Sequence, residues 1–203
     1  MPENSSTTDA RDWDAAYSGT APPPWDIGRP QPRFEVLARA GAFRGRILDC
    51  GCGTGEHALL VSAEGADALG IDLSERAVSQ ARAKAQSRGL PARFEVANAL
   101  TFRAPEPFDV VLDCGVFHVF DDTDRATYVN TLRALIRPGG TLYLMCFSDR
   151  EPGDWGPRRV SATELYDAFA NGWRMDLAPS TMSVNPIEGR TEVQAWFAAV
   201  VRA

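Results

Sequence analysis

The stretch Asp49-Cys50-Gly51-Cys52-Gly53-Thr54-Gly55 decides the fold, because it follows a short apolar run and precedes a helical pattern. Glycines at such a point let the backbone approach a ligand and permit the tight turn that aims a helix N-terminus at it. The spacing, G-x-G-x-G, is shorter than the G-x-G-x-x-G of dinucleotide-binding oxidoreductases, which argues against an NAD enzyme. Asp72 stands 19 residues beyond Gly53, where a carboxylate accepts hydrogen bonds from ribose hydroxyls. The alternative is a turn residue that caps the following helix.

Short apolar runs alternate with amphipathic segments along most of the chain. They predict strands over 46–50, 68–72, 93–96, 110–114 and 141–147, and helices over 57–65, 74–89 and 124–136. A helix over 161–170 follows, and then two consecutive strands over 173–184 and 193–201. This order predicts an α/β fold, a Rossmann-like, doubly wound sheet of seven mainly parallel strands with an antiparallel C-terminal hairpin strand.

The length of 203 residues fits one domain, 1–203. We expect residues 1–12 to be mobile, 13–44 to form an N-terminal arm over the site, and 45–203 to form the core. The arm includes a short helical pattern over 12–17 and a prolyl turn at 22–24, which excludes helix there.

Net charge and the search for targeting signals limit the partners and the compartment that the sequence predicts. The formal net charge of −6 argues against a broad phosphate-binding surface, so we expect no nucleic-acid partner. No run of about 18 apolar residues predicts a membrane span, and the first dozen residues do not resemble a secretion signal. We therefore expect a cytoplasmic protein, a monomer or a weak homodimer. The four cysteines show no metal-ligand spacing, so we expect no metal site.

Five segments, taken in order, resemble the successive motifs of class I S-adenosylmethionine-dependent methyltransferases. They are the 49–55 turn, Asp72, Asn98-Ala99, Asp113 and Pro138-Gly139-Gly140. The resemblance covers about residues 40–203 and implies S-adenosylmethionine as cofactor. It implies that Asp49, Gly51 and Gly53 lie at the amino-acid end, that Asp72 and Leu73 hold the ribose, that Asn98 and Ala99 meet the adenine, and that Cys114 lies beside the methionine portion. Many family members carry Asp where this chain has Asn98, whose amide oxygen also accepts a hydrogen bond.

The N-terminal arm resembles that of the halide/thiol and thiopurine S-methyltransferases, and the chain is also similar to short bacterial heterocycle-methylating enzymes. Trp13, Tyr17 and the segment 24–30 with Trp25 carry the resemblance of the arm, which implies that the three rings cover the cofactor. Aromatic faces suit a sulfonium cation and exclude water. The alternative is that these rings only bury the arm itself.

The segment after the fourth expected strand supplies the candidates for the acceptor side. His118 is the candidate general base, because its ordinary pKa of about 6.5 lies in the useful range. Phe117 and Phe120 are expected to shape an apolar pocket, although either also fits the core. Trp25 and Arg29 are further candidate substrate-binding residues, Arg29 for an anionic group. The Pro/Gly-rich segment 151–157, with Trp155, is either a lid or an exposed connection.

Two functions are close alternatives at this point. One is methyl transfer by in-line displacement to a soft nucleophile, a thiol, a thiopurine-like sulfur or a halide, which needs no base and suggests detoxification. The other is O- or N-methylation of a small, quinolone-like aromatic heterocycle with His118 as base. A nucleic-acid methyltransferase is disfavoured, because 113–116 lacks an Asn/Asp-Pro-Pro-aromatic motif. A nucleoside-binding sensor without turnover is a remote alternative.

Overall fold

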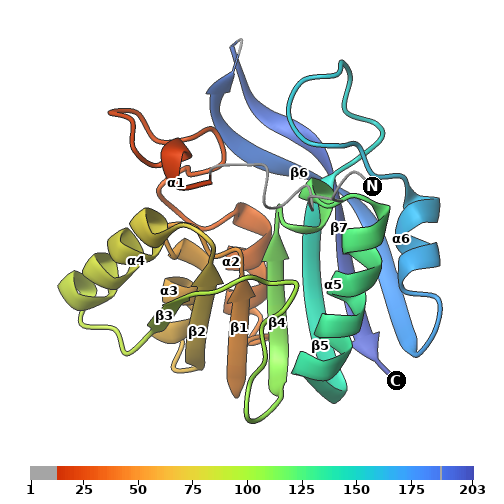
Figure 1. The fold of residues 1–203 in the computed structure, drawn as a ribbon, viewed down its shortest axis with the longest axis horizontal. Coiled ribbons are helices and arrows are strands. Elements are labelled where there is room, and N and C mark those ends of the chain that lie inside the picture. Colours follow the sequence, from red (N-terminus) through yellow and green to blue (C-terminus); the bar gives the residue numbers. More distant parts are fainter. Residues whose placement is uncertain (1–12, 188) are drawn as a thin grey trace, which may run out of the picture.

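The structure is a computed structural model that describes residues 13–187 and 189–203. Seven strands form one sheet in the order β3-β2-β1-β4-β5-β7-β6 (Figure 1). The strands are β1 (Arg46–Cys50), β2 (Asp67–Asp72), β3 (Arg93–Val96), β4 (Phe108–Cys114), β5 (Ile136–Phe147), β6 (Trp173–Ile187) and β7 (Arg190–Arg202). The helices are α1 (Trp13–Ala16), α2 (Pro32–Arg39), α3 (Glu56–Ala63), α4 (Glu75–Arg88), α5 (Asp122–Leu135) and α6 (Ala162–Ala168), with a 3₁₀ turn η1 (Phe117–Val119).

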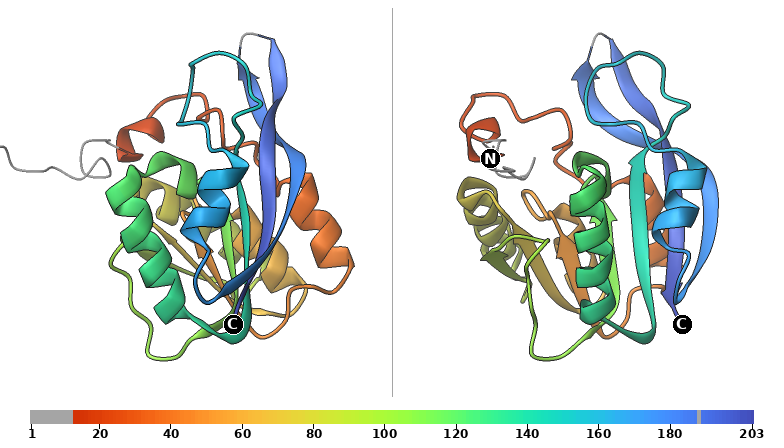
Figure 2. Two further views of the ribbon diagram at one scale, coloured as in Figure 1. Left: turned by 90° about the vertical axis from the view of Figure 1, so that its right-hand side faces the viewer. Right: turned by 45° about the vertical axis from the view of Figure 1, so that its right-hand side comes forward.

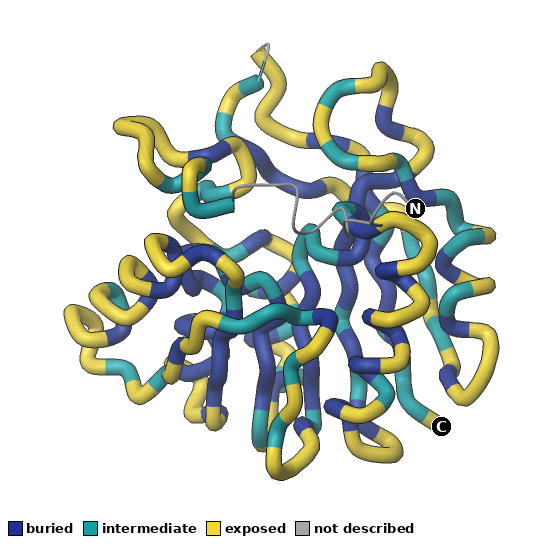
Figure 3. The backbone as a smooth tube through the Cα atoms, in the orientation of Figure 1, coloured by how far each residue is buried: buried dark blue, intermediate teal, exposed yellow. Residues whose placement is uncertain are grey.

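The predicted seven-stranded, mainly parallel sheet is confirmed. Strands β1 to β5 pair in parallel, whereas β7 is antiparallel to both β5 and β6. The reason is that a hairpin joins β6 to β7 without a crossover helix, so the chain must reverse. Helices α5 and α6 cover one face and α2 the other (Figure 2). Figure 3 shows buried backbone through the central strands and exposed backbone at the loops.

Local capping chemistry determines where several helices begin and end. The Ser74 side chain accepts a hydrogen bond from the Ala77 N–H at the start of α4, and Gly89, at φ 62°, ends that helix. Ser161 and Glu164 form a complete capping box on α6. These polar side chains satisfy backbone donors that the first turn of a helix leaves unpaired.

The expected boundaries near Pro138 were wrong. Helix α5 begins at Asp122 and not at residue 124. The reason is that the Asp121 side chain caps the helix by accepting a hydrogen bond from the Asp124 N–H. It ends at Leu135, and β5 begins at once with Ile136, which pairs with Phe108. Residues 138–140 are therefore an irregularity within β5 and do not lie between a helix and a strand.

The carboxyl ends of the parallel strands carry three additional segments. The hairpin β6–β7 is longer than expected and rises beyond this edge, next to the 148–160 loop and opposite α1 (Figures 1 and 2). The hairpin pairs continuously from Trp173 with Arg202 to Ser183 with Glu192.

No described helix has the length and apolar character needed to cross a membrane. The expectation of mobility over 1–12 lies outside the described residues.

Candidate functional site

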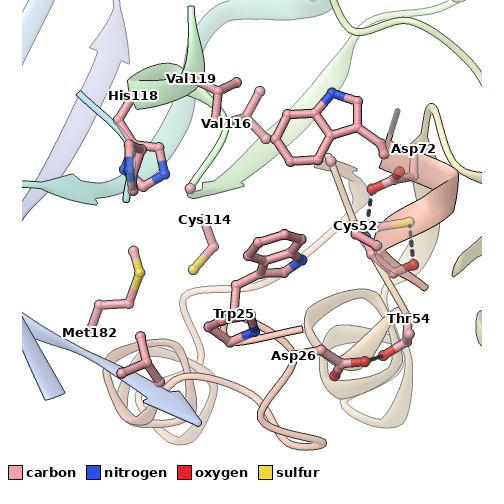
Figure 4. Close-up of a pocket in the computed structure, with 18 of the residues that line it drawn as sticks. Trp25, Asp26, Cys52, Thr54, Asp72, Cys114, Val116, His118, Val119 and Met182 are labelled. Atoms are coloured by element: carbon pink, nitrogen blue, oxygen red, sulfur yellow. Dashed lines mark hydrogen bonds between the residues drawn. The ribbon is translucent and has the colours of Figure 1, made fainter. Parts of the chain in front are cut away.

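A cavity of about 720 Å³ lies at the carboxyl edge of the sheet, between the arm, the hairpin and the 148–160 loop. One side, the glycine-loop side, comprises Gly51, Cys52, Gly53, Thr54, Asp72, Leu73, Ala97, Asn98 and Ala99. The other, the hairpin side, comprises Phe147, Trp155, Gly156, Pro157, Met182, Val184 and Ile187. Figure 4 shows His118 and Met182 across the cavity from Asp72 and Thr54, with Trp25 between them.

The glycine loop has a backbone that side chains would not tolerate. Gly51 and Gly53 have φ of 63° and 52°. A Cβ on Gly51 would lie 2.2 Å from Val116 Cγ2, and a Cβ on Gly53 would lie 3.0 Å from the Tyr17 hydroxyl. The loop therefore presents bare backbone to the cavity and brings the arm close above it.

Asp72 lies on the cavity wall at the end of β2, as the sequence predicted for a ribose-binding carboxylate. One oxygen accepts a hydrogen bond from the Gly53 N–H at 2.8 Å, and the other accepts one from the Ser74 N–H at 2.9 Å. Burial raises the pKa of this carboxyl. Each carboxylate oxygen has two acceptor positions, so both can still accept a ribose hydroxyl.

Asp49 lies behind the glycine loop, at the end of β1. Its side chain is buried and does not belong to the described residues that line the cavity. Its Oδ2 accepts a hydrogen bond from the Ala58 N–H at 3.1 Å. Burial raises the pKa of Asp49 to about 8. This contact with Ala58 joins β1 to the first turn of α3 behind the glycine loop.

Asn98 and Ala99 line the cavity beyond β3. The Asn98 Oδ1 accepts a hydrogen bond from the Leu100 N–H at 2.8 Å, so this oxygen already has a partner. The side-chain NH₂ and the second lone pair of Oδ1 remain as groups that suit the edge of a purine. Leu73, 38% exposed, supplies an apolar surface nearby.

The three arm aromatics pack together on the cavity. The Trp25 Nε1–H donates a hydrogen bond to the Tyr17 hydroxyl at 2.9 Å, and the Trp13 and Trp25 rings meet edge to face at 5.9 Å. Burial raises the pKa of Tyr17. Asp14 accepts hydrogen bonds from Ser74 Oγ and from the Arg76 backbone and side chain, which fixes α1 to the start of α4.

Polar contacts that the sequence analysis missed hold the arm closed. Thr54 donates a hydrogen bond to Asp26 Oδ2 at 3.0 Å, and Lys84 Nζ donates one to Thr54 Oγ1 at 2.7 Å. The buried Gln31 side chain pairs with both the N–H and the C=O of Ser183 in β6. Nothing in the local sequence signals these contacts, because Gln31 and Ser183 are 152 residues apart.

The turn after β4 positions His118. Asp113 accepts hydrogen bonds from the Val116 and Phe117 N–H groups, and burial raises its pKa to about 6. His118 is 5% exposed and lines the cavity, and its Nδ1 accepts a hydrogen bond from the Phe147 N–H at 2.9 Å. Cys114 also lines the cavity, and burial raises the pKa of its thiol.

Phe117, which the sequence allowed either in the pocket or in the core, lies in the core. Its ring is fully buried against Phe169, with the Arg125 guanidinium 4.7 Å from its centroid. Phe120 lines the cavity instead. The 3₁₀ turn η1 rotates successive side chains in different directions, which strand periodicity does not predict.

Three further candidates from the sequence, Arg29, His57 and Arg158, differ in where they lie relative to the cavity. Arg29 is exposed and lines the cavity near Ile27. His57 also lines it, and its Nε2 accepts a hydrogen bond from the Gln31 N–H at 3.1 Å. Arg158 pairs with Asp122 and Glu164. Among the residues that the structure describes, no group of three His, Cys, Asp or Glu side chains is placed to hold a metal ion.

Comparisons with known proteins agree with this geometry. A family model described as a methyltransferase domain matches residues 47–140. The chain is 30% identical to 2-heptyl-1-hydroxyquinolin-4(1H)-one methyltransferase of Mycobacteroides abscessus over 85% of this chain and 81% of that protein. It is 27% identical to a probable thiol methyltransferase 2 of Arabidopsis thaliana, over 97% and 87% of the two chains.

A solved structure is also similar. It is described for the conversion of a disulfide bond into a thioacetal group during echinomycin biosynthesis. It shares 38% identity and a TM-score of 0.84 with this chain, covering 93% of this chain and 91% of that one.

Proposed function

The chain belongs to the class I S-adenosylmethionine-dependent methyltransferases, and on that premise we propose that it methylates a soft anionic nucleophile on a small molecule. The nucleophile is a thiolate, a thiopurine-like sulfur or a halide. The observation that carries this proposal is the hydrogen bond from the Phe147 N–H to His118 Nδ1. It bears directly on whether the site contains a general base.

The described residues fit S-adenosylmethionine. We propose that Asp72 and Leu73 hold the ribose, that Asn98 and Ala99 border the adenine, and that Gly51, Gly53 and Cys114 border the amino-acid end. Trp13, Tyr17 and Trp25 would cover it, since aromatic faces stabilise a cation. When bound, the cofactor supplies a methyl group on a sulfonium sulfur, which an acceptor displaces in line. The positive φ of Gly51 and Gly53 supports this fit, because it lets the loop present backbone without side chains to the cavity.

The hydrogen bond to His118 argues against a general base. A neutral imidazole carries one proton, and because Nδ1 accepts the Phe147 N–H, that proton sits on Nε2. The ring gains a second proton only if it breaks the hydrogen bond to Phe147. We therefore propose that His118 lines the acceptor site without acting as a general base. An acceptor that arrives as an anion needs no such base.

The rest of the acceptor side supports the same class. Much of the wall near His118 is built from apolar and sulfur-containing groups, among them Met182, Val184 and Phe120, although Arg29 and His57 also line the cavity. A wall of this kind excludes water and leaves a soft anion poorly solvated, which favours displacement. Two of the similar proteins are described in terms of sulfur, a thiol in one case and a disulfide in the other.

Methylation of an aromatic heterocycle is the second candidate. The relative from Mycobacteroides abscessus is named for a hydroxyquinolone. In this chain such an acceptor would need to ionise before binding, since His118 is not arranged to deprotonate it. Detoxification is the role that we propose for either chemistry. The four free thiols suit the reducing cytoplasm, where we place a monomer or weak homodimer.

Transfer of labelled methyl from S-adenosylmethionine to three acceptors tests the proposal. The acceptors are benzenethiol, iodide and 4-hydroxyquinoline, each at pH 6 and pH 8. We expect turnover of benzenethiol and iodide, with the iodide rate unchanged by pH. Turnover of the heterocycle alone, with a rate that rises through a histidine-like pKa, would reverse the order of the candidates. Cofactor binding without transfer to any acceptor, cell extract included, would indicate the sensor.

A further inference from the structure

The loop between β5 and α6, residues 148–160, forms part of the hairpin side of the cavity. Trp155, Gly156 and Pro157 line the cavity from this loop. The loop rises beside the hairpin at the same edge of the sheet (Figures 1 and 2). Its two ends are joined, because the Val160 N–H donates to Phe147 O and the Asp149 N–H donates to Val160 O. Its ends are therefore tied to β5, and part of it lines the cavity, while residues 152–154, 156 and 158 are exposed.

A buried carboxylate fixes this loop to β7. Glu151 is 6% exposed, and its Oε2 accepts a hydrogen bond from the Gln194 N–H at 2.6 Å. Its Oε1 forms an ion pair with Arg190 Nη1 at 3.1 Å. Breaking a buried pair by removing one partner is costly, because the remaining charge loses its compensation. The anchor therefore determines where the loop stands against the hairpin.

Trp155 is the large flat side chain that this anchor places on the cavity. Its ring meets Phe147 edge to face, with centroids 5.6 Å apart. The Arg159 and Arg190 guanidinium groups lie 5.4 and 6.0 Å from its centroid. The Arg159 side chain donates to the carbonyl oxygens of Glu151, Gly153 and Pro157, so backbone contacts hold it in place. Glu151 compensates the charge of Arg190, whereas the hydrogen bonds of Arg159 go to neutral carbonyl oxygens, so Arg159 places positive charge beside the indole.

We propose that Trp155 is the specificity-determining residue of the acceptor side, and that it selects planar aromatic acceptors in their anionic form over small acceptors. The inference deepens the proposed function and rests on it for the reaction. Its physical basis is that an indole offers a large flat surface to a planar ring. The neighbouring Arg159 guanidinium favours negative charge on that ring. A small anion such as iodide lacks the area to use this surface.

The test compares two acceptors that differ in size, 2-naphthalenethiol and iodide, on Trp155→Ala, Trp155→Phe and the wild type. We expect Trp155→Ala to raise the KM for 2-naphthalenethiol by about tenfold or more. The KM for S-adenosylmethionine and kcat/KM for iodide should change by less than about twofold, and Trp155→Phe should restore most of the loss. The control is Tyr166→Ala, an exposed aromatic on α6 that does not line the cavity. Equal losses for both acceptors, or none for the thiol, would overturn the proposal.

A binding measurement separates this proposal from the proposed reaction. Equilibrium dialysis of 2-naphthalenethiol against the protein saturated with S-adenosylhomocysteine needs no turnover. We expect about tenfold weaker binding to Trp155→Ala than to the wild type. Glu151→Gln keeps an oxygen that accepts the Gln194 N–H but loses the charge that faces Arg190. This variant should weaken the binding of 2-naphthalenethiol less than Trp155→Ala does. Equal affinity of wild type and Trp155→Ala overturns the role of Trp155. A wild type that binds the thiol but methylates neither acceptor contradicts the reaction instead.

Discussion

The backbone N–H of Phe147, the last residue of β5, donates a hydrogen bond to Nδ1 of His118 at 2.9 Å, and both residues line the cavity. The two residues are 29 positions apart in the sequence. This contact selects the imidazole tautomer with the proton on Nε2. It thereby argues against His118 as the general base that the sequence suggested.

For His118→Ala we expect a modest kinetic loss and a clear loss of stability. With iodide, kcat/KM should fall less than about tenfold, because no proton is transferred. The Phe147 N–H would lose its acceptor in a buried site, which costs about 1–3 kcal/mol. Steady-state kinetics and thermal denaturation measure the two effects. A wild-type rate that rises near pH 6.5 with iodide, and no longer does so in the variant, would contradict the prediction.

Asp72→Asn should weaken cofactor binding by about ten- to hundredfold. Both oxygens of Asp72 accept backbone N–H groups, so an amide places its NH₂ against one of these donors. Isothermal titration of S-adenosylmethionine measures the change. The matched control is Asp67→Asn at the other end of β2, where an exposed carboxylate pairs with Arg93. A similar loss of affinity in both variants would indicate an effect of charge alone.

Thr54→Val should loosen the arm. The hydroxyl of Thr54 joins Lys84 to Asp26, and valine removes both hydrogen bonds while it keeps the shape of the side chain. We expect faster amide exchange over 22–31 and a severalfold higher Kd for S-adenosylmethionine. Thr127→Val on the exposed surface of α5 is the control. Hydrogen exchange followed by mass spectrometry makes the measurement, and unchanged exchange in the arm would count against the role of this contact.

Gly51→Ala should abolish cofactor binding, whereas Gly65→Ala should not affect it. Both glycines have positive φ, 63° and 87°, so both substitutions strain the backbone by about 1 kcal/mol or more. Only at Gly51 does a Cβ meet a neighbour, Val116 Cγ2 at 2.2 Å; at Gly65 it meets nothing within 4 Å. Melting temperatures measured without cofactor report the backbone strain in each variant. The rise in melting temperature on adding cofactor reports whether the variant still binds it. Normal cofactor binding by Gly51→Ala would contradict the assignment of the glycine loop.

His57 should make the protein less stable in mild acid. Burial lowers the pKa of His57 to about 4, from an ordinary value near 6.5. Below pH 6.5 the unfolded chain takes up a proton that the folded protein does not. The contribution of His57 to the free energy of unfolding is therefore present above pH 6.5 and is lost as the pH falls toward 4.

Urea denaturation at pH 7 and pH 5 tests this prediction. The loss of stability between the two values should be smaller in His57→Gln than in the wild type, by up to about 2 kcal/mol. Glutamine retains an oxygen that can accept the Gln31 N–H, which limits other losses. Identical pH dependence in the two proteins would show that the imidazole does not titrate differently on folding.

The sequence by itself determined the sheet, the glycine turn and the caps of α4 and α6. These features depend on alternation of apolar residues and on side chains that act within a few residues, such as Ser74 on the Ala77 N–H. It also determined that Asp72 stands at the end of β2. Interactions of this range can be read from spacing alone, since the chain has little freedom between the partners.

The tertiary structure alone decided which of several neighbouring side chains reach the cavity and which hydrogen bonds they form there. Asp49 turns to Ala58 and Phe117 turns into the core, whereas Phe120 faces the cavity. Contacts between distant segments, Gln31 with Ser183 and Glu151 with Arg190, set the position of the arm and of the Trp155 loop. Such contacts form only after the sheet has brought these segments together, so no local pattern in the sequence encodes them.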